Sequence, residues 1–467
     1  MGGLALHGGC QYPDASLLEF ASPLAAQGPP ASGDGAGPRR CLPGAVGIHP
    51  FSGVFAAISR RGAVRILCLS AWFPYPPDVG ARIRLHYLLT ALGATHAVDL
   101  LCFFHGQEER VSPEVLPSGV SLLGALPAPT DRRSRPSLAD LFSPYPRALA
   151  EQYVPEMAAS LKAALSGACC DLVLTFDVGP GVTAAPYLLE VQGVRRVVVD
   201  PEISMIWTKA RTARGLVARL RYGLTWQKQR RYTRELLLWV DGCVVPSDVE
   251  RRLILDIVPD GPPLAVVPNG VDLNRYQGDF GPVEPDTLVF PGALTYKANF
   301  EAMRFFLTEV FPRIRQARPQ ATLYITGRTD GVDLRRLPLG DGVVLTGYLP
   351  DVRPRVARSA VCIAPLTLGG GTRIKILEAM ALGTPVVATS KGAEGLDVTP
   401  GRDLLIADDP ADFAAAVVRI LENPELRASL STAGRRVAER YDWRAIGGQL
   451  NAFLEGIHNE DTKTRSR

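Results

Sequence analysis

Hydrophobic residues gather in short continuous runs from about residue 64 onward. Such runs occupy residues 64–70 (VRILCLS), 97–104 (AVDLLCFF), 172–176 (LVLTF), 197–200 (VVVD) and 242–247 (GCVVPS). Runs of this length without polar alternation are typical of strands that a parallel sheet buries on both faces. Helical segments, such as residues 82–92, separate them, and this alternation predicts a doubly wound sheet. Residues 107–143 are rich in proline and are predicted to be irregular.

The pattern stops at PDGPP, residues 259–263, which predicts a linker, and then it begins again. A second set of strands is predicted at residues 288–290, 321–327, 343–347, 361–365 and 384–390, with helices at 299–315 and 373–382. The sequence therefore predicts an α/β fold of two facing Rossmann-like domains. Sheets of this kind bind ligands beyond the carboxyl ends of their strands, so we expect an interdomain cleft there.

Four segments follow from this division of the chain. Residues 1–62 are rich in Gly, Pro, Ala and Ser and are predicted to be disordered, or else not part of the native protein. The first Rossmann-like domain is predicted at 63–260 and the second at 264–440. Residues 441–467 are predicted to form a C-terminal helix and tail.

Composition narrows the function classes. The 467 residues include 46% hydrophobic and 21% charged residues with a net charge of +4, which gives no case for a nucleic-acid partner. None of the eight cysteines forms a CxxC pair, so we expect no metal site and a reducing compartment. No apolar run reaches the ~20 residues that span a bilayer, and the first residues do not resemble a secretory signal. A cytoplasmic location is predicted.

The stretch at residues 206–240 is strongly basic and carries three tryptophans. Its charged residues are Lys209, Arg211, Arg214, Arg219, Arg221, Lys228, Arg230, Arg231 and Arg234, against Glu235 alone. One interpretation is peripheral contact with the inner face of a membrane through anionic lipids. The other is a solvated helix face with its apolar side in the core, and the sequence favours this one.

The segment at residues 365–389, PLTLGGGTRIKILEAMALGTPVVAT, carries the clearest chemistry. Glycines that precede a helix let backbone amides approach an anion, which the helix N-terminus attracts. Arg373 and Lys375 place positive charge where the helix dipole disfavours it, and a bound diphosphate would explain them. The alternative is a glycine turn capped by Thr372, with Lys375 paired to Glu378.

This segment resembles the donor-binding signature of group 1 (family 4-type) glycosyltransferases. Three other runs occur in the family's order, namely VVPNGVD at 266–272, FPGALTYKANFEA at 290–302 and VVLTGYLPDV at 343–352. The resemblance covers nearly all of residues 264–445. It implies the GT-B fold, with the nucleotide-sugar donor in the second domain and the acceptor on the first. It also implies retaining chemistry, no metal and no cofactor.

The resemblance assigns donor-binding roles by position in these motifs. Glu378 matches the ribose-binding glutamate, Lys297 lies near the phosphate-binding lysine, and Gly292 lies in the loop that lets the diphosphate approach. The remaining donor-binding candidates are Gly370, Gly371, Thr372, Arg373 and Lys375. Two positions in the second domain depart from the family, and in the first domain Asp177 follows Phe176 where many relatives carry a histidine. Gly370 stands where many members carry a sugar-contacting glutamate, and Ala293 stands where an arginine is frequent.

Candidate catalytic residues follow from the charge that the reaction develops. Arg373 and Lys375 would stabilise the leaving diphosphate electrostatically. Asp177 follows a predicted strand and faces the predicted cleft, although an aspartate there also caps turns. Gly80 and Arg82, which follow the first strand, are the acceptor-side candidates, and a plain loop with a surface arginine is the alternative.

The resulting hypothesis is a hexosyltransferase-type glycosyltransferase. It would move a sugar from a nucleotide-diphosphate sugar to a glycan or lipid-linked acceptor in polysaccharide or glycoconjugate biosynthesis. A nucleotide-sugar epimerase on the same fold and a non-catalytic nucleotide-binding module stay open as alternatives. An NAD-dependent oxidoreductase is disfavoured because no G-x-G-x-x-G fingerprint follows the first strand.

Overall fold

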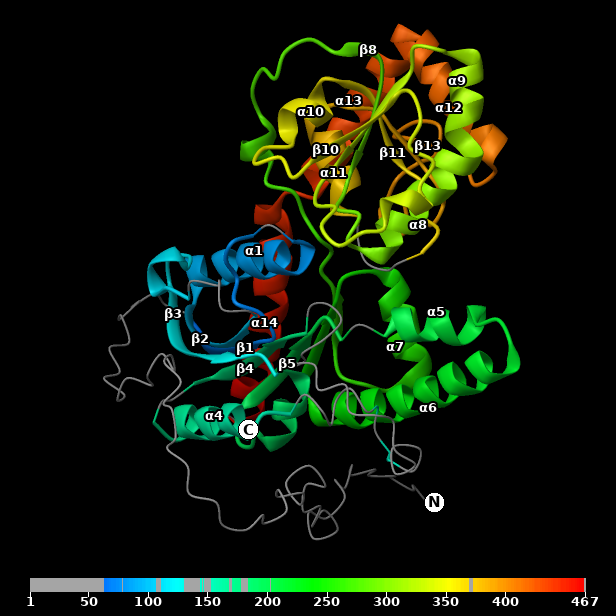
Figure 1. Cartoon of the computed structure of the whole chain (residues 1–467). Coiled ribbons are helices and arrows are strands. Elements are labelled where there is room, and N and C mark those ends of the chain that lie inside the picture. Colours follow the sequence, from blue (N-terminus) through cyan, green and yellow to red (C-terminus); the bar gives the residue numbers. More distant parts are fainter. Residues whose placement is uncertain are drawn as a thin grey trace, which may run out of the picture. The chain divides into compact units, whose positions relative to one another are not determined.

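A computed structural model of the chain shows two parallel sheets, each surrounded by helices (Figure 1). It describes residues 63–77, 79–105, 111–129, 143–144, 146, 153–167, 170–177, 184–201, 203–368 and 373–465. The extension predicted at residues 1–62 lies outside the described residues. The alternation of strands and helices predicted from the hydrophobic runs is confirmed in both halves of the chain.

The first sheet has seven described strands in the order β3-β2-β1-β4-β5-β6-β7, and every neighbouring pair is parallel. The strands are β1 (Arg65–Ser70), β2 (Ala97–Phe104), β3 (Val120–Pro127), β4 (Leu172–Phe176), β5 (Arg195–Val199), β6 (Gly242–Val245) and β7 (Leu264–Val266). The helices between them are α1 (Gly80–Thr95), η2 (Pro113–Val115), α4 (Pro155–Gly167), η3 (Ala185–Glu190), α5 (Ser204–Thr212), α6 (Leu216–Trp239) and α7 (Asp248–Ile257).

The second sheet has six described strands in the order β10-β9-β8-β11-β12-β13, again all parallel. They are β8 (Glu284–Pro291), β9 (Thr322–Thr326), β10 (Val343–Gly347), β11 (Ser359–Ala364), β12 (Val386–Ala388) and β13 (Leu405–Ile406). The helices are η4 (Leu273–Tyr276), α8 (Lys297–Phe305), the π-helix η5 (Phe306–Val310), α9 (Phe311–Ala317), η6 (Leu334–Arg336), α10 (Arg353–Ala357), α11 (Ile374–Leu382), α12 (Pro410–Glu422), α13 (Pro424–Arg440) and α14 (Trp443–Arg465).

Both faces of each sheet are buried, which explains why the strands read as continuous apolar runs. In β1, Leu67 and Leu69 enter one hydrophobic cluster, while Ile66 and Cys68 enter the cluster on the opposite face. Successive strand side chains point to opposite faces, so a strand covered on both sides needs apolar residues at every position. The second sheet repeats this arrangement in β8.

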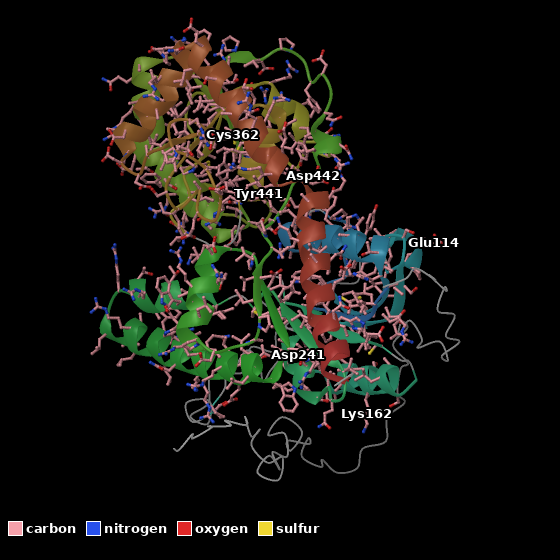
Figure 2. All side chains as sticks on the ribbon, turned by 180° about the vertical axis from the view of Figure 1, so that it is seen from behind. Glu114, Lys162, Asp241, Cys362, Tyr441 and Asp442 are labelled. Atoms are coloured by element: carbon pink, nitrogen blue, oxygen red, sulfur yellow. The ribbon has the colours of Figure 1, made fainter. Side chains whose placement is uncertain are left out.

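The last helix of the chain returns to the first domain. In α14, Trp443, Ile446 and Leu450 belong to the same cluster as the strands of the first sheet. The contact with α1 is close, because a Cβ added at Gly447 would lie 2.2 Å from the Cβ of Ala91. Figure 2 shows Asp442 just before this helix begins, where it forms an isolated bridge with Val271.

Three details differ from the sequence prediction. Residues 107–143 are not wholly irregular, because they include η2 and the strand β3. In β3, Ser121 and Pro127 are exposed and the other six residues are partly buried, so exposed and buried positions do not alternate. The second domain does not start at residue 264, because β7 pairs with β6 in the first sheet. The helix predicted at 299–315 begins at Lys297 and is interrupted by the π-helix η5.

The basic stretch at residues 206–240 forms parts of the two helices α5 and α6. No helix in the described part of the chain has the length and apolar character required to span a membrane. Within the described ranges there is also no group of three or more His, Cys, Asp or Glu side chains suited to a metal ion.

Candidate functional site

The candidate site lies at the carboxyl ends of the central strands of the second sheet. The strand β8 ends at Pro291 and is followed by Gly292, while β9 ends at Thr326 and is followed by Gly327. Gly327 has a φ of +100°, which favours glycine, and a Cβ there would lie 2.7 Å from the backbone nitrogen of Ala293. The missing side chain at Gly327 therefore lets the loop after β9 lie directly against the loop after β8.

Gly292 leaves room for a pair of polar side chains. A Cβ at this position would lie 2.8 Å from Asn299 Nδ2 and 2.9 Å from Lys375 Nζ. Lys375 Nζ donates a 2.8 Å hydrogen bond to Asn299 Oδ1, and Asn299 Nδ2 donates to the carbonyl of Ala293 at 2.9 Å. The amide of Asn299 thus fixes the lysine ammonium beside the glycine backbone.

Lys375 is held in an environment that disfavours its charge. Burial lowers its pKa to about 7, and the charge of nearby Arg373 acts in the same direction. Its Nζ also lies 4.2 Å from the ring centroid of Phe290, a buried residue near the end of β8. A half-buried cation with a lowered pKa gains most from an anionic ligand, because the anion replaces the missing solvation.

Glu378 lies one turn further along α11. Its Oε1 accepts a 2.6 Å hydrogen bond from the hydroxyl of Tyr276, at the end of η4. Burial raises the pKa of Glu378, which Tyr276 and Lys375 partly oppose, and burial also raises the pKa of the Tyr276 hydroxyl. A carboxylate so placed can accept hydrogen bonds from the hydroxyl groups of a ligand.

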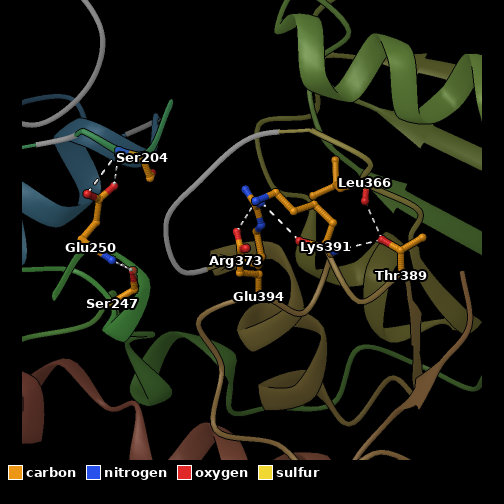
Figure 3. A network of polar contacts seen from close by, with 9 residues as sticks. Ser204, Ser247, Glu250, Leu366, Arg373, Thr389, Lys391 and Glu394 are labelled. Carbon is orange, nitrogen blue, oxygen red and sulfur yellow. Dashed lines mark hydrogen bonds and ion pairs between the residues drawn. The ribbon is translucent and has the colours of Figure 1, made fainter. Parts of the chain in front are cut away.

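Arg373 precedes the first residue of α11 and is only 8% exposed. Its Nη2 donates to the carbonyl of Lys391 at 3.3 Å, and Lys391 in turn forms a 2.5 Å ion pair with Glu394 (Figure 3). The neighbouring Thr389 hydroxyl donates to the carbonyl of Leu366 and accepts from the amide of Gly392. The loop after β12 therefore holds the arginine at the start of the helix.

The remaining donor-side candidates are partly outside this cluster. Gly370, Gly371 and Thr372 lie outside the described residues, so their assigned roles stay predictions. Lys297 is described as the first residue of α8 and is exposed. The structure thus brings Gly292, Lys375 and Glu378 to one edge of the sheet, with Arg373 at the start of the same helix.

The first-domain candidates have structural partners of their own. Asp177 is 7% exposed and accepts hydrogen bonds from the backbone amides of Ala184 and Ala185 at the start of η3. This is the capping role that the sequence left open, and a catalytic role for Asp177 stays a prediction. Gly80 is the first residue of α1, and the guanidinium of Arg82 lies 5.5 Å from the ring centroid of Trp72.

Sequence reasoning missed the partners of the two main site residues. Neither Asn299 nor Tyr276 was singled out, although Asn299 lies inside the run FPGALTYKANFEA and Tyr276 follows VVPNGVD by four residues. Position within these motifs was the available signal. Hydropathy could not provide it, because both partners are distant from α11 in sequence.

Taken together, the geometry fits a ligand with an anionic part and a hydroxyl-bearing part. Arg373, Lys375 and the glycine backbone at Gly292 suit a phosphate or diphosphate. Glu378, one helical turn away, suits a sugar hydroxyl.

A family model describes part of the chain. Residues 285–423 match the model named "Glycosyl transferases group 1". These residues include the carboxyl ends of β8 and β9, where the candidate site lies, and the whole of α11. The resemblance that the motifs predicted is therefore confirmed for this part of the chain.

Curated relatives include mannosyltransferases. The chain is 30% identical over 238 residues to the phosphatidyl-myo-inositol mannosyltransferase of Mycobacterium tuberculosis, an alignment that covers 48% of this chain and 62% of the relative. It is 31% identical over 163 residues to a GDP-mannose-dependent monoacylated alpha-(1-6)-phosphatidylinositol monomannoside mannosyltransferase of Corynebacterium glutamicum, covering 32% of this chain and 42% of that one. The chain thus spans less than two thirds of the length of these relatives.

Solved structures share the fold. Sucrose-phosphate synthase from Thermosynechococcus elongatus is similar with a TM-score of 0.60 at 18% identity, over 85% of this chain and 100% of that one. HepE from Anabaena, solved in complex with UDP-glucose, gives a TM-score of 0.58 at 15% identity, over 84% of this chain and 100% of that one. At this identity the likeness concerns the fold alone, and it confirms the predicted GT-B arrangement of two Rossmann-like domains.

Proposed function

Because residues 285–423 match the family model named "Glycosyl transferases group 1", we propose that this chain transfers a hexose from a nucleotide-diphosphate sugar to an acceptor. The observation that carries the proposal is the cluster of Gly292, Asn299, Lys375 and Glu378 at one edge of the second sheet. The cation beside the glycine backbone suits the diphosphate of a nucleoside diphosphate, and the carboxylate one helical turn away suits its ribose. The mannosyltransferase names of the relatives support the reaction class.

The donor would be bound with its diphosphate at the start of α11. Lys375 and Arg373 would offer the positive charge, and Gly292 leaves the space in which Asn299 holds Lys375 beside the backbone. Glu378 would accept hydrogen bonds from the ribose hydroxyls. The hydrogen bond from Tyr276 occupies one of its two carboxylate oxygens, so the other would take the ribose.

The chemical step would break the bond between the anomeric carbon and the phosphate oxygen and form a bond between that carbon and a hydroxyl oxygen of the acceptor. Negative charge then develops on the diphosphate, and Lys375 and Arg373 would stabilise it because they are fixed before the reaction begins. In a transfer with retention the departing phosphate takes the acceptor proton on the same face of the sugar. This route requires neither a protein nucleophile nor a metal ion.

The acceptor would be a glycan or a lipid-linked glycan bound on the first domain, near Gly80 and Arg82. Two relatives are named for transfer to phosphatidylinositol lipids, which supports a lipid-linked acceptor. Donors of this kind are made in the cytoplasm, so we place the reaction there. The process would be the assembly of a polysaccharide or a glycoconjugate.

The first test is a thermal-unfolding panel of the purified chain with UDP, GDP, ADP, TDP, CMP and NAD. A ligand at about 100 times its Kd stabilises the folded state by about 2.7 kcal/mol. We expect a shift of the unfolding midpoint with one nucleoside diphosphate. The sugar nucleotide of that base is then incubated with glycolipid acceptors, and product is followed by mass spectrometry. A shift with NAD alone would contradict the proposal, and sugar interconversion without transfer would favour an epimerase.

A further inference from the structure

The helices α5 and α6 form a hairpin at the outer edge of the first domain (Figure 1). The turn between them contains Gly215, whose φ of +85° favours glycine. The far end of α6 is fixed to the domain, because Trp239 Nε1 donates to the carbonyl of Leu188 at 3.0 Å and Leu236 lies in the core. The end of α6 beside the turn is therefore the free end of the hairpin.

Four apolar residues at this free end face away from the protein. Leu216 is 74% exposed, Val217 80%, Leu220 66% and Leu224 41%. None of them belongs to a hydrophobic cluster or packs against one in the described part of the chain. A single exposed leucine is ordinary, but neighbouring exposed apolar residues on one face of a helix favour a binding surface.

The four residues form one strip along α6. Leu216, Leu220 and Leu224 are spaced by four residues, so they lie above one another on the helix, and Val217 lies beside them. Each residue of an α-helix is rotated by about 100° from the one before it. By this rotation the buried residues Thr233, Leu236 and Leu237 lie on the side of α6 opposite to the strip. The helix thus has two apolar faces, one against the core and one outward.

The tryptophans do not contribute to the outward strip. Trp207 and Trp226 pack against the core of the first domain, and Trp239 is held by its bond to Leu188. The strip is therefore aliphatic, and the three tryptophans of this basic stretch have a structural role.

Positive charge surrounds the strip. The exposed basic residues of α5, the turn and α6 are Lys209, Arg211, Arg214, Arg219, Arg221, Arg230, Arg231 and Arg234. Glu235 is the one acidic residue of the two helices, and it is engaged with Arg231 at 2.9 Å. An aliphatic strip bordered by many cations is complementary to a surface that offers acyl chains below a layer of negative charge.

We infer that the free end of the α5–α6 hairpin docks on an anionic lipid bilayer, with Leu216, Val217, Leu220 and Leu224 inserted at the interface. Arg214, Arg219 and Arg221 then lie at the level of the lipid headgroups. The helix needs no rearrangement to do so, because its core-facing side stays packed. The hairpin would keep the domain at a membrane surface independently of the sugar that is transferred.

The test is vesicle flotation of the full chain. One vesicle preparation is pure phosphatidylcholine, and the other is an equal mixture of phosphatidylcholine and phosphatidylglycerol. We expect the chain to float with the mixed vesicles, to float poorly with the neutral ones, and to be released as salt is raised. Absence of flotation with the mixed vesicles at low salt would overturn the inference.

Two variants identify the surface. Leu216→Gln combined with Leu220→Gln removes two apolar side chains that would contact the lipid acyl chains. We expect the partitioning of the chain onto the mixed vesicles to fall at least about tenfold. Arg214→Gln combined with Arg221→Gln should lose roughly fivefold per charge and flatten the salt dependence. Glutamine is a good helix former, so the unfolding midpoint of each variant should match that of the parent chain.

Leu255→Gln is the matched control, because Leu255 is a singly exposed leucine on α7. It should float like the parent chain. Equal flotation of the Leu216→Gln, Leu220→Gln variant and the parent would overturn the inference. A second result would also overturn the inference: the parent chain fails to bind vesicles and is a dimer in light scattering, whereas the double variant is a monomer. The strip would then be an interface between two copies of the chain. Neither result depends on sugar transfer, so failure here leaves the proposed function intact.

Discussion

Arg84 and Asp200 form a buried bidentate ion pair at the carboxyl end of β5. Arg84 Nε lies 2.5 Å from Asp200 Oδ2, and Arg84 Nη2 lies 2.8 Å from Oδ1, with side chains 2% and 5% exposed. The same guanidinium donates to the carbonyls of Val267 and Pro268. Asp200 has a φ of +60°, so the pair also holds a left-handed backbone position that aspartate seldom occupies.

Replacement of Arg84 by methionine should strongly destabilise the first domain. It would leave the buried Asp200 carboxylate and two carbonyls without their donor, which costs about 3–5 kcal/mol for a buried pair. The measurement is the unfolding midpoint in urea. Arg65→Met is the control, because its pair with Asp171 is 42% and 28% exposed and should contribute about 1 kcal/mol or less. Equal losses in the two variants would contradict this account.

Replacement of Glu378 by alanine should weaken nucleoside diphosphate binding by about 10- to 100-fold. Hydrogen bonds to a charged group contribute about 1.5–3 kcal/mol, and Glu378 is the carboxylate placed for the ribose. Isothermal titration calorimetry measures the affinity. Glu422→Ala on α12 is the control, since the Glu422 side chain is 53% exposed and its Oε1 lies 3.9 Å from Arg318 Nη1. Unchanged affinity in Glu378→Ala would remove Glu378 from the ribose.

Nucleoside diphosphate binding should weaken as pH rises above 7. The pKa of Lys375 is lowered to about 7, so the free site loses its ammonium charge through this range. Bound diphosphate favours the charged form, and binding therefore takes up a proton near pH 8. Titrations in buffers of different ionisation enthalpy measure this uptake. In Lys375→Arg the guanidinium stays charged, so both the proton uptake and the pH dependence should disappear.

The same pKa sets the sign of a stability effect. Because the folded pKa of Lys375 lies below the ordinary lysine value of 10.5, the unfolded chain binds more protons between about pH 7 and 10.5. The contribution of Lys375 to the free energy of unfolding therefore rises with pH across this window. Below pH 7 both states are protonated and the dependence ends. A contribution that falls with pH, taken as the difference between parent and Lys375→Met, would show that the lysine is not buried as described.

Replacement of Gly292 by alanine should disrupt the site with little effect on the fold. The new Cβ would lie within 3 Å of Asn299 Nδ2 and Lys375 Nζ, so these two side-chain ends have to shift and their hydrogen bond is disturbed. We expect about a tenfold loss of nucleoside diphosphate affinity, since this bond positions a charged group. Gly340→Ala is the control, because nothing lies within 4 Å of a Cβ there. Retained affinity in Gly292→Ala would exclude a close approach of the ligand at this loop.

Hydropathy predicted the fold because the sheets are buried on both faces. The runs at residues 97–104 and 172–176 coincide with β2 and β4. The pattern failed where burial is incomplete. Most residues of β3 are partly exposed and the strand contains Ser121 and Gly124, while β7 has only three residues beside a proline-rich linker, so the hydrophobic pattern predicted neither strand.

The site was predictable only as far as local motifs extend. Lys375 and Glu378 are three residues apart on one helix, and the motif around them is visible in sequence. Their partners Asn299 and Tyr276 come from other elements, 76 and 102 residues away. The Arg84–Asp200 pair spans 116 residues in the same manner. Such contacts depend on the order of strands in the sheet, which hydropathy alone does not specify.

The return of α14 to the first domain affects how the protein can fold during synthesis. The core of the first domain includes Ile446, Leu450 and Leu454, which follow the whole of the second sheet in the sequence. Ribosomal synthesis usually lets an N-terminal domain fold before the rest of the chain emerges. Here the order is reversed, because the second sheet and its helices are complete at Arg440 while the first sheet still lacks one covering helix. The nascent first domain would therefore expose that apolar face to solvent until α14 has been synthesised.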